Sequence, residues 1–221
     1  MRTIRALTIA SAIAAVLPAT ASAQQGRQFK DAWFWGVKGG GFALADTAQQ
    51  YKTYGLAGVD WVITRTHAAL YISGSQAFFT QQAFAFRDPN SPADSGLRAI
   101  DLKNMRKLDM ALLAFPGRHD RFHPYAGAGF TVAQVASATP QGPFGSVDQI
   151  TYAQAVVQDR KVSIAPMFIA GLQARLSWFS VFAQGTAMVS QNDFILYNGR
   201  PWNMSFEAGL RYNVGTSIDR N

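Results

Sequence analysis

The segment from residue 204 to residue 214, MSFEAGLRYNV, alternates strictly between apolar side chains and polar or small ones. Because successive side chains on a β-strand point to opposite faces, this segment predicts a strand with one apolar and one polar face. Two kinds of closed sheet contain such strands. In a soluble barrel the apolar face lies inside, whereas in a membrane barrel it contacts lipid, and Glu207 and Arg211 face the lumen.

Other segments of the chain repeat this period-two pattern. Together they predict an all-β protein, an eight-stranded antiparallel up-and-down transmembrane β-barrel. The strands are expected near residues 33–42, 54–63, 67–79, 102–115, 122–136, 162–176, 179–189 and 204–214.

The predicted connections between these strands alternate in length. Residues 64–66, 116–121 and 177–178 make short connections, whereas residues 43–53, 80–101, 137–161 and 190–203 make long ones. Outer-membrane barrels have short turns on the periplasmic side and long loops outside the cell, whereas a soluble barrel has no need of this asymmetry. An even number of strands also places both chain ends on the side of the short turns.

The polar faces of the predicted strands carry mostly Gly, Ser, Thr and Gln. A face in contact with water usually carries many charged side chains, but an eight-stranded lumen has room only for side chains that fill it closely. Aromatic residues gather near the short-turn ends, as in the girdle of a membrane barrel; the alternative is an ordinary aromatic core. The predicted girdle consists of Trp33, Trp35, Trp61, Trp178, Phe122 and Tyr212. We therefore predict that the apolar faces contact lipid.

The N-terminal residues have the pattern of a bacterial secretory signal peptide. Arg2 and Arg5 precede an apolar run that is too short to span a bilayer, and Ala21-Ser22-Ala23 is a small-x-small cleavage site. The expected organisation is a signal peptide over residues 1–23, a short segment over 24–32, the barrel over 33–214 and a periplasmic tail over 215–221. The sequence contains no cysteine, so disulfides cannot stabilise the exported protein.

Ionisable residues fall on the inward face of several predicted strands: Lys38, Asp60, Lys107, Asp109, Arg175, Glu207 and Arg211. Glu207 and Arg211 are about 13 Å apart along one strand, so their partners must come from neighbouring strands. Buried charges persist only when they are paired and hydrogen-bonded. We predict a charged plug in the periplasmic half of the lumen; the alternative is that strand tilt separates these charges.

No residue pattern in the sequence predicts catalysis, a metal site or a cofactor. His119 and His123, with Asp120 between them, do not converge on a strand as they would on a helix. A Ser-His-acid site is also disfavoured, because His67 lies about 20 Å along its strand from Ser73, and Ser75 lies farther still. The run Gly39-Gly40-Gly41 lacks the Lys-Ser/Thr of a phosphate loop and is read as a bend or bulge.

The segments HPYAGAGF at residues 123–130 and FEAGLRYNV at residues 206–214 resemble the small eight-stranded outer-membrane β-barrel family, similar to the transmembrane domain of outer membrane protein A and its single-domain relatives. The resemblance covers essentially the whole mature chain. It implies a Gram-negative outer membrane, a barrel without cofactor, and insertion by the outer-membrane assembly machinery. The tail TSIDRN departs from the pattern, because this class usually ends on an aromatic residue.

The expected function is that of a monomeric, non-enzymatic outer-membrane barrel with a structural or surface-interaction role. Its partners would be outer-membrane lipids, and a surface partner could bind loops 80–101 and 137–161. The net charge of +7 is scattered, without a nucleic-acid motif, so no nucleic-acid partner is expected. Exposed aromatics could bind a hydrophobic solute or rest on the barrel mouth: Phe78, Phe79, Phe84, Phe86 and Phe144. Two alternatives are binding or passage of small hydrophobic molecules at the barrel mouth and a soluble, periplasmic lipocalin-like carrier.

Overall fold

The computed structural model describes residues 31–46, 48–91, 96–116, 121–197 and 200–216. It contains eight strands in a closed antiparallel barrel, in which each strand pairs with its neighbours in sequence and β1 pairs with β8. The strands are β1 (Ala32–Ala45), β2 (Tyr51–Thr64), β3 (Ala68–Arg87), β4 (Leu97–Ala114), β5 (Phe122–Pro140), β6 (Val162–Leu176), β7 (Phe179–Val189) and β8 (Trp202–Thr216). The predicted up-and-down barrel is therefore confirmed. The predicted signal peptide and most of the predicted tail lie outside the described residues.

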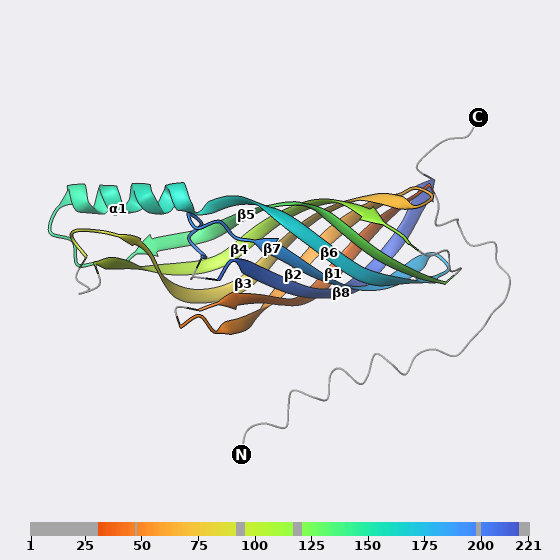
Figure 1. Cartoon of the computed structure of the whole chain (residues 1–221), viewed down its shortest axis with the longest axis horizontal. Helices are drawn as coiled ribbons and strands as arrows, with labels where there is room; N and C mark the ends of the chain where they lie inside the picture. The colour runs from red at the N-terminus through yellow and green to blue at the C-terminus, as the bar shows by residue number, and fades with distance from the viewer. Residues whose placement is uncertain (1–30, 47, 92–95, 117–120, 198–199, 217–221) are drawn as a thin grey trace, which may run out of the picture.

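One end of the barrel holds both ends of the described chain, since Ala32 of β1 pairs with Thr216 of β8. We call it the terminal end; the β2–β3, β4–β5 and β6–β7 connections lie here. The opposite end carries the helix α1 (Val147–Arg160), and we call it the α1 end. Figure 1 shows that β3, β4, β5 and α1 extend beyond the other strands at this end.

The predicted long loops are shorter than expected, because the strands continue into them. Residues 80–87 belong to β3, residues 97–101 to β4 and residues 137–140 to β5, so the prediction of loops over 80–101 and 137–161 is wrong in these parts. The β1–β2 connection spans only residues 46–50 and is no longer than the β4–β5 connection. The asymmetry between the two ends is therefore built mainly by extended strands and a helix.

The helix α1 was not predicted. The side chain of Ser146 caps its first turn by accepting a hydrogen bond from the backbone N–H of Gln149. Asp148 in the first turn and Arg160 in the last turn match the helix dipole. Ala153 and Val157, four residues apart, are buried against the mouth of the barrel. No helix in the described part of the chain is long and apolar enough to cross a membrane.

The outer surface of the barrel is apolar. Large apolar side chains project from it, with exposed fractions of 61% for Val37, 69% for Leu112 and 70% for Phe206. Their neighbours in sequence point inward and are buried, as in β8, where exposed and buried residues alternate from Trp202 to Glu207. A soluble protein rarely exposes such a continuous apolar surface, so this surface requires an apolar solvent.

The lumen is filled by three layers of side chains. An apolar cluster that includes Phe34, Val62, Tyr71 and Leu113 lies toward the terminal end. A second apolar cluster fills the α1 end, where Phe194, Ile195 and Leu196 of the β7–β8 connection pack with residues of β1–β5 and α1. Charged and polar side chains occupy the space between the two clusters.

Candidate functional site

Arg211 of β8 lies at the centre of the polar layer and is completely buried. Its Nη2 donates a hydrogen bond of 2.8 Å to Oδ2 of Asp60 on β2, and its Nη1 donates one of 2.8 Å to Oε1 of Gln173 on β6. The guanidinium lies 3.7 Å from the ring centroid of Phe182. This one side chain therefore connects groups on both sides of the lumen by charge-assisted hydrogen bonds.

The contact between Arg211 and Asp60 crosses the strand that separates them. β1 lies between β2 and β8, and its residue Gly36 pairs with Asp60 on one side and with Arg211 on the other. A Cβ atom on Gly36 would lie 2.2 Å from Oδ1 of Asp60 and 2.8 Å from Cγ of Arg211. Any side chain at residue 36 would therefore force the Asp60 and Arg211 side chains to shift.

A second ion pair joins β1 to β8. Nζ of Lys38 lies 2.6 Å from Oε2 of Glu207, and both side chains are fully buried. Glu207 also accepts hydrogen bonds from Nε2 of Gln184 and from the hydroxyl of Ser205. The Tyr71 hydroxyl accepts from both Lys38 and Gln184, and so links this pair to the rest of the polar layer.

A third pair lies on β4 alone. Nζ of Lys107 is 3.6 Å from Oδ2 of Asp109, and the hydroxyl of Thr131 on β5 donates to Oδ1 of Asp109. The layer thus contains three buried cations and three buried carboxylates in the described part of the lumen. This balance of charge is what a buried ionic cluster requires.

Arg175, the remaining residue of the predicted plug, lies elsewhere. It pairs with Ser180 beside the β6–β7 turn and is half-buried, so it lies at the rim of the terminal end. Its partner Ser180 is buried, but Arg175 itself does not lie at the depth of the other six residues. Sequence reasoning missed the uncharged members of the layer, Tyr71, Gln173 and Gln184, because only charged residues were selected.

The predicted girdle residues lie on the outer surface near the terminal end. Trp35, Trp178, Phe122 and Tyr212 are exposed by 42–51%, and Trp33 by 36%. The rings of Trp33 and Trp35 each lie 5.4 Å from the ring of Trp61. Tyr51 and Trp202 were not predicted: they meet toward the α1 end, where the Tyr51 hydroxyl donates to the Trp202 carbonyl.

The residues considered for catalysis or metal binding do not converge. His67 is exposed at the β2–β3 turn, whereas Ser73 and Ser75 are buried in the lumen. His119 and Asp120 lie outside the described residues, and His123 is buried on β5. Among the described residues, no group of His, Cys, Asp and Glu side chains could hold a metal ion.

The three glycines of β1 do not form the predicted bend or bulge. The pairing of β1 with β2 and β8 runs without a shift through Gly39, Gly40 and Gly41, and the shift lies at Trp33 and Phe34 instead. A Cβ atom on Gly40 would lie 1.9 Å from the carbonyl oxygen of Phe206. Gly40 therefore permits a close approach of β1 and β8.

The aromatic residues of the α1 end divide between the two sides of the wall. Phe79 and Phe86 are buried in the mouth, whereas Phe78 is 49% exposed on the outside. Phe144 lies under the guanidinium of Arg98, 4.5 Å from ring centroid to Cζ. The side chain of Phe84 is outside the described part of the chain.

Arg98 links the chain segments at the tip of the α1 end. It forms a buried ion pair with Asp88 and donates to the carbonyl oxygens of Asn90 and Gln141. Burial opposes ionisation of Asp88, but the backbone N–H of Asn90 and the Arg98 guanidinium outweigh it and lower the pKa of this carboxyl. The β3–β4 hairpin and the segment before α1 are thereby joined.

A closed sheet with an apolar exterior and an ionic interior is the reverse of a soluble barrel. The alternation of exposed and buried residues along β1, β7 and β8 decides this orientation. The architecture is that of an outer-membrane β-barrel. The interpretation of the sequence as this kind of barrel is therefore confirmed at the level of the fold.

The solved structures that resemble this chain share little of its sequence. No protein-family model matches the chain, and no curated protein sequence matches it. Among solved structures, the attachment invasion locus protein Ail of Yersinia pestis is similar, with 10% identity, a TM-score of 0.46, and coverage of 84% of this chain and 99% of Ail. Neisserial surface protein A has 8% identity, a TM-score of 0.49, and coverage of 81% and 96%. A de novo designed transmembrane β-barrel has 12% identity, a TM-score of 0.36, and coverage of 85% and 99%.

Proposed function

We propose that this chain is a monomeric integral protein of a Gram-negative outer membrane with a structural or surface-interaction role. Residues 1–23 would direct its export, and the outer-membrane assembly machinery would insert it. The observation that carries the proposal is the inverted barrel, in which Leu210 faces outward and its neighbour Arg211 is buried in an ionic cluster. Such a protein spans the bilayer with every strand backbone paired.

The filled lumen argues against a general diffusion pore. An eight-stranded barrel has an interior just wide enough for side chains. Here an apolar cluster, an ionic layer and a second apolar cluster follow one another along the axis.

The two alternative functions have less support. Passage of a hydrophobic molecule needs an open mouth, but Phe194, Ile195 and Leu196 are buried in it. A soluble carrier needs a polar exterior, whereas residues such as Phe168 and Phe206 are exposed on the outside. A surface partner would reach the α1 end, where α1 exposes Val147 and Tyr152.

Cell fractionation with a heat-modifiability gel tests the location. We expect the protein in the outer-membrane pellet, with unheated samples migrating differently from boiled ones because the barrel resists detergent. Release by osmotic shock without detergent would contradict the proposal. A vesicle-swelling assay tests the closed lumen: vesicles with the protein should swell in small sugars no faster than vesicles without it, and faster swelling would indicate a pore.

A further inference from the structure

Two cationic residues on the outer face of β4, Lys103 and Arg106, lie next to the apolar band on the side of the α1 end. In register across β3, β4 and β5, the row Gly74, Leu108 and Val132 is followed toward the α1 end by the row Gln76, Arg106 and Gln134. The next rows are Thr80, Lys103 and Ser137, and then Gln82, Asp101 and Thr139. Apart from Phe78, which is exposed on β3 between the rows of Gln76 and Thr80, the outer face changes from apolar to polar between Leu108 and Arg106. This change marks the boundary between hydrocarbon and headgroups.

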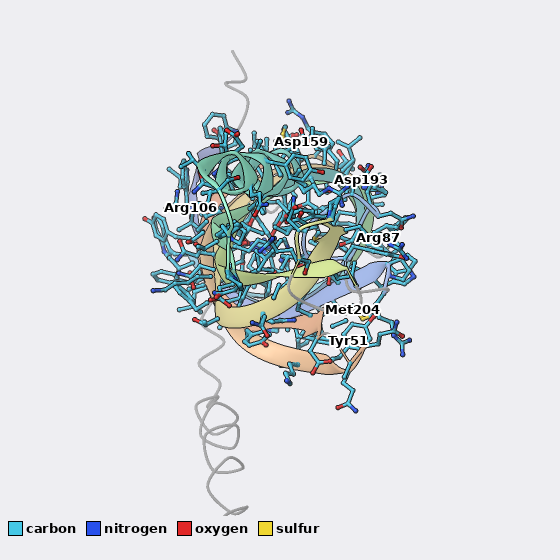
Figure 2. The ribbon with its side chains drawn as sticks, turned by 90° about the vertical axis from the view of Figure 1, so that its left-hand side faces the viewer. Tyr51, Arg87, Arg106, Asp159, Asp193 and Met204 are labelled. Atoms are coloured by element: carbon cyan, nitrogen blue, oxygen red, sulfur yellow. The ribbon has the colours of Figure 1, made fainter. Side chains whose placement is uncertain are left out.

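A β-bulge places both cations on this face. Residues three apart on a regular strand point to opposite sides, so Lys103 and Arg106 would not lie together. The β3–β4 register shifts by one residue between Ala77 and Thr80, and Asn104, which lies opposite this shift, adopts a left-handed backbone with φ of 56°. Its Oδ1 accepts a hydrogen bond from the backbone N–H of Phe79, which holds the bulge in place. Both Lys103 and Arg106 are consequently exposed, and Figure 2 shows Arg106 pointing away from the barrel axis.

The surface beside Lys103 is hollow. A depression of about 490 Å³ is lined by polar residues of all three strands, including Thr80, Gln82, Ser137 and Thr139. Within the described part of the chain, neither Lys103 nor Arg106 belongs to an ion pair. Asp101 lines the hollow on the side of the α1 end, and its carboxylate accepts a hydrogen bond from the Gln141 amide.

We propose that this patch, comprising Lys103, Arg106 and the adjoining polar hollow, binds the headgroup of a phosphate-bearing glycolipid of the outer leaflet. Arg106 and Lys103 would contact phosphate, for which guanidinium and ammonium groups are suited. The hydroxyl and amide groups of the hollow would contact sugar hydroxyls. The lipid's acyl chains would continue onto the apolar band below, past Leu108 and Val132. The inference rests on the proposed membrane orientation.

The test uses nanodiscs of phosphatidylcholine that contain a small fraction of lipid A. Native mass spectrometry after detergent extraction measures how much lipid A stays with the barrel. The double variant Lys103→Gln/Arg106→Gln is compared with the control Arg87→Gln/Arg200→Gln, which removes the same charge from exposed positions outside the patch. Because each cation near an anionic membrane surface strengthens binding about fivefold, the double variant should retain about thirtyfold less lipid A. The control variant should retain as much as the unmodified protein.

Three results would overturn the proposal. One is equal retention of lipid A by the Lys103→Gln/Arg106→Gln variant. Another is an equal loss in the control variant, which would indicate an effect of net charge. The last is that the unmodified protein retains phosphatidylglycerol or dephosphorylated lipid A as well as it retains lipid A. That result would exclude recognition of a phosphorylated glycolipid. A heat-modifiability gel on every variant shows whether the barrel has folded and inserted, and so tests the proposed function separately. A barrel that inserts but does not retain lipid A contradicts only the proposed lipid-binding patch.

Discussion

Removal of the Arg211 guanidinium should destabilise the barrel strongly. In the variant Arg211→Met, Asp60 loses hydrogen bonds of 3.2, 3.2 and 2.8 Å from this guanidinium. The Asp60 side chain is completely buried, so no water replaces the lost partner. Breaking a buried ion pair in this way costs about 3–5 kcal/mol, because an uncompensated charge remains.

A second substitution tests whether that remaining charge is the cause. The double variant Asp60→Asn/Arg211→Met removes the carboxylate as well, and its free energy of unfolding should be higher than that of Arg211→Met by about 2 kcal/mol. The matched control is Arg65→Met at the terminal end, where Arg65 is half exposed and lies 3.3 Å from Asp31. Such an exposed pair contributes about 0–1 kcal/mol.

The assay is reversible urea unfolding of the barrel in lipid vesicles, followed by tryptophan fluorescence. The order of stability should be unmodified protein and Arg65→Met together, then the double variant, then Arg211→Met. If Arg211→Met cost no more than Arg65→Met, or if the Asp60→Asn change gave no recovery, the lumen pair would not be the buried, mutually dependent pair described above.

The remaining predictions test the wall, the strand crossing and the α1 end. Leu210→Arg should cost about 2–4 kcal/mol in the same vesicle assay, because it places a charge in hydrocarbon; no loss would mean that Leu210 does not face lipid. Gly36→Ala should cost about 1–3 kcal/mol through its clash with Asp60, whereas Gly55→Ala, which meets open space, should change stability by less than about 0.5 kcal/mol. Because the pKa of Asp88 is lowered, its pair with Arg98 stabilises the tip above the usual carboxyl pKa and is lost as pH falls through the lowered value. Hydrogen exchange at Arg98, corrected for the intrinsic rate, should therefore accelerate in acid in the unmodified protein, whereas Asp88→Asn should show fast exchange at every pH.

The strands and their orientation could be predicted because period-two alternation records which side chains meet lipid. The same alternation placed Lys38, Asp60 and Glu207 in the lumen, and the closure of the sheet brought β8 next to β1. It could not give depth, so Arg175 was placed with the others although it lies at the rim. The choice of partners also depends on register and on Gly36, which no periodicity reveals.

The α1 end was less predictable, because tertiary contacts determine it. Only Ala153 and Val157 of α1 are buried, which is too weak a pattern to distinguish a helix from a loop. The bulge at Asn104 reverses the facing of residues on either side of it, so Leu102 and Met105 both point inward. A strand with one such irregularity has no strict alternation, so its periodicity does not reveal the polar patch on its outer face.

The most direct test of the account is the environment of residue 210. The chain contains no cysteine, so Leu210→Cys can carry a single nitroxide label in the vesicle-inserted barrel. The label should collide often with oxygen dissolved in the bilayer and rarely with a water-soluble nickel chelate, because Leu210 faces hydrocarbon. A label shielded from oxygen, or one that the nickel chelate reaches freely, would contradict the orientation on which the lumen, the girdle and the lipid patch all depend.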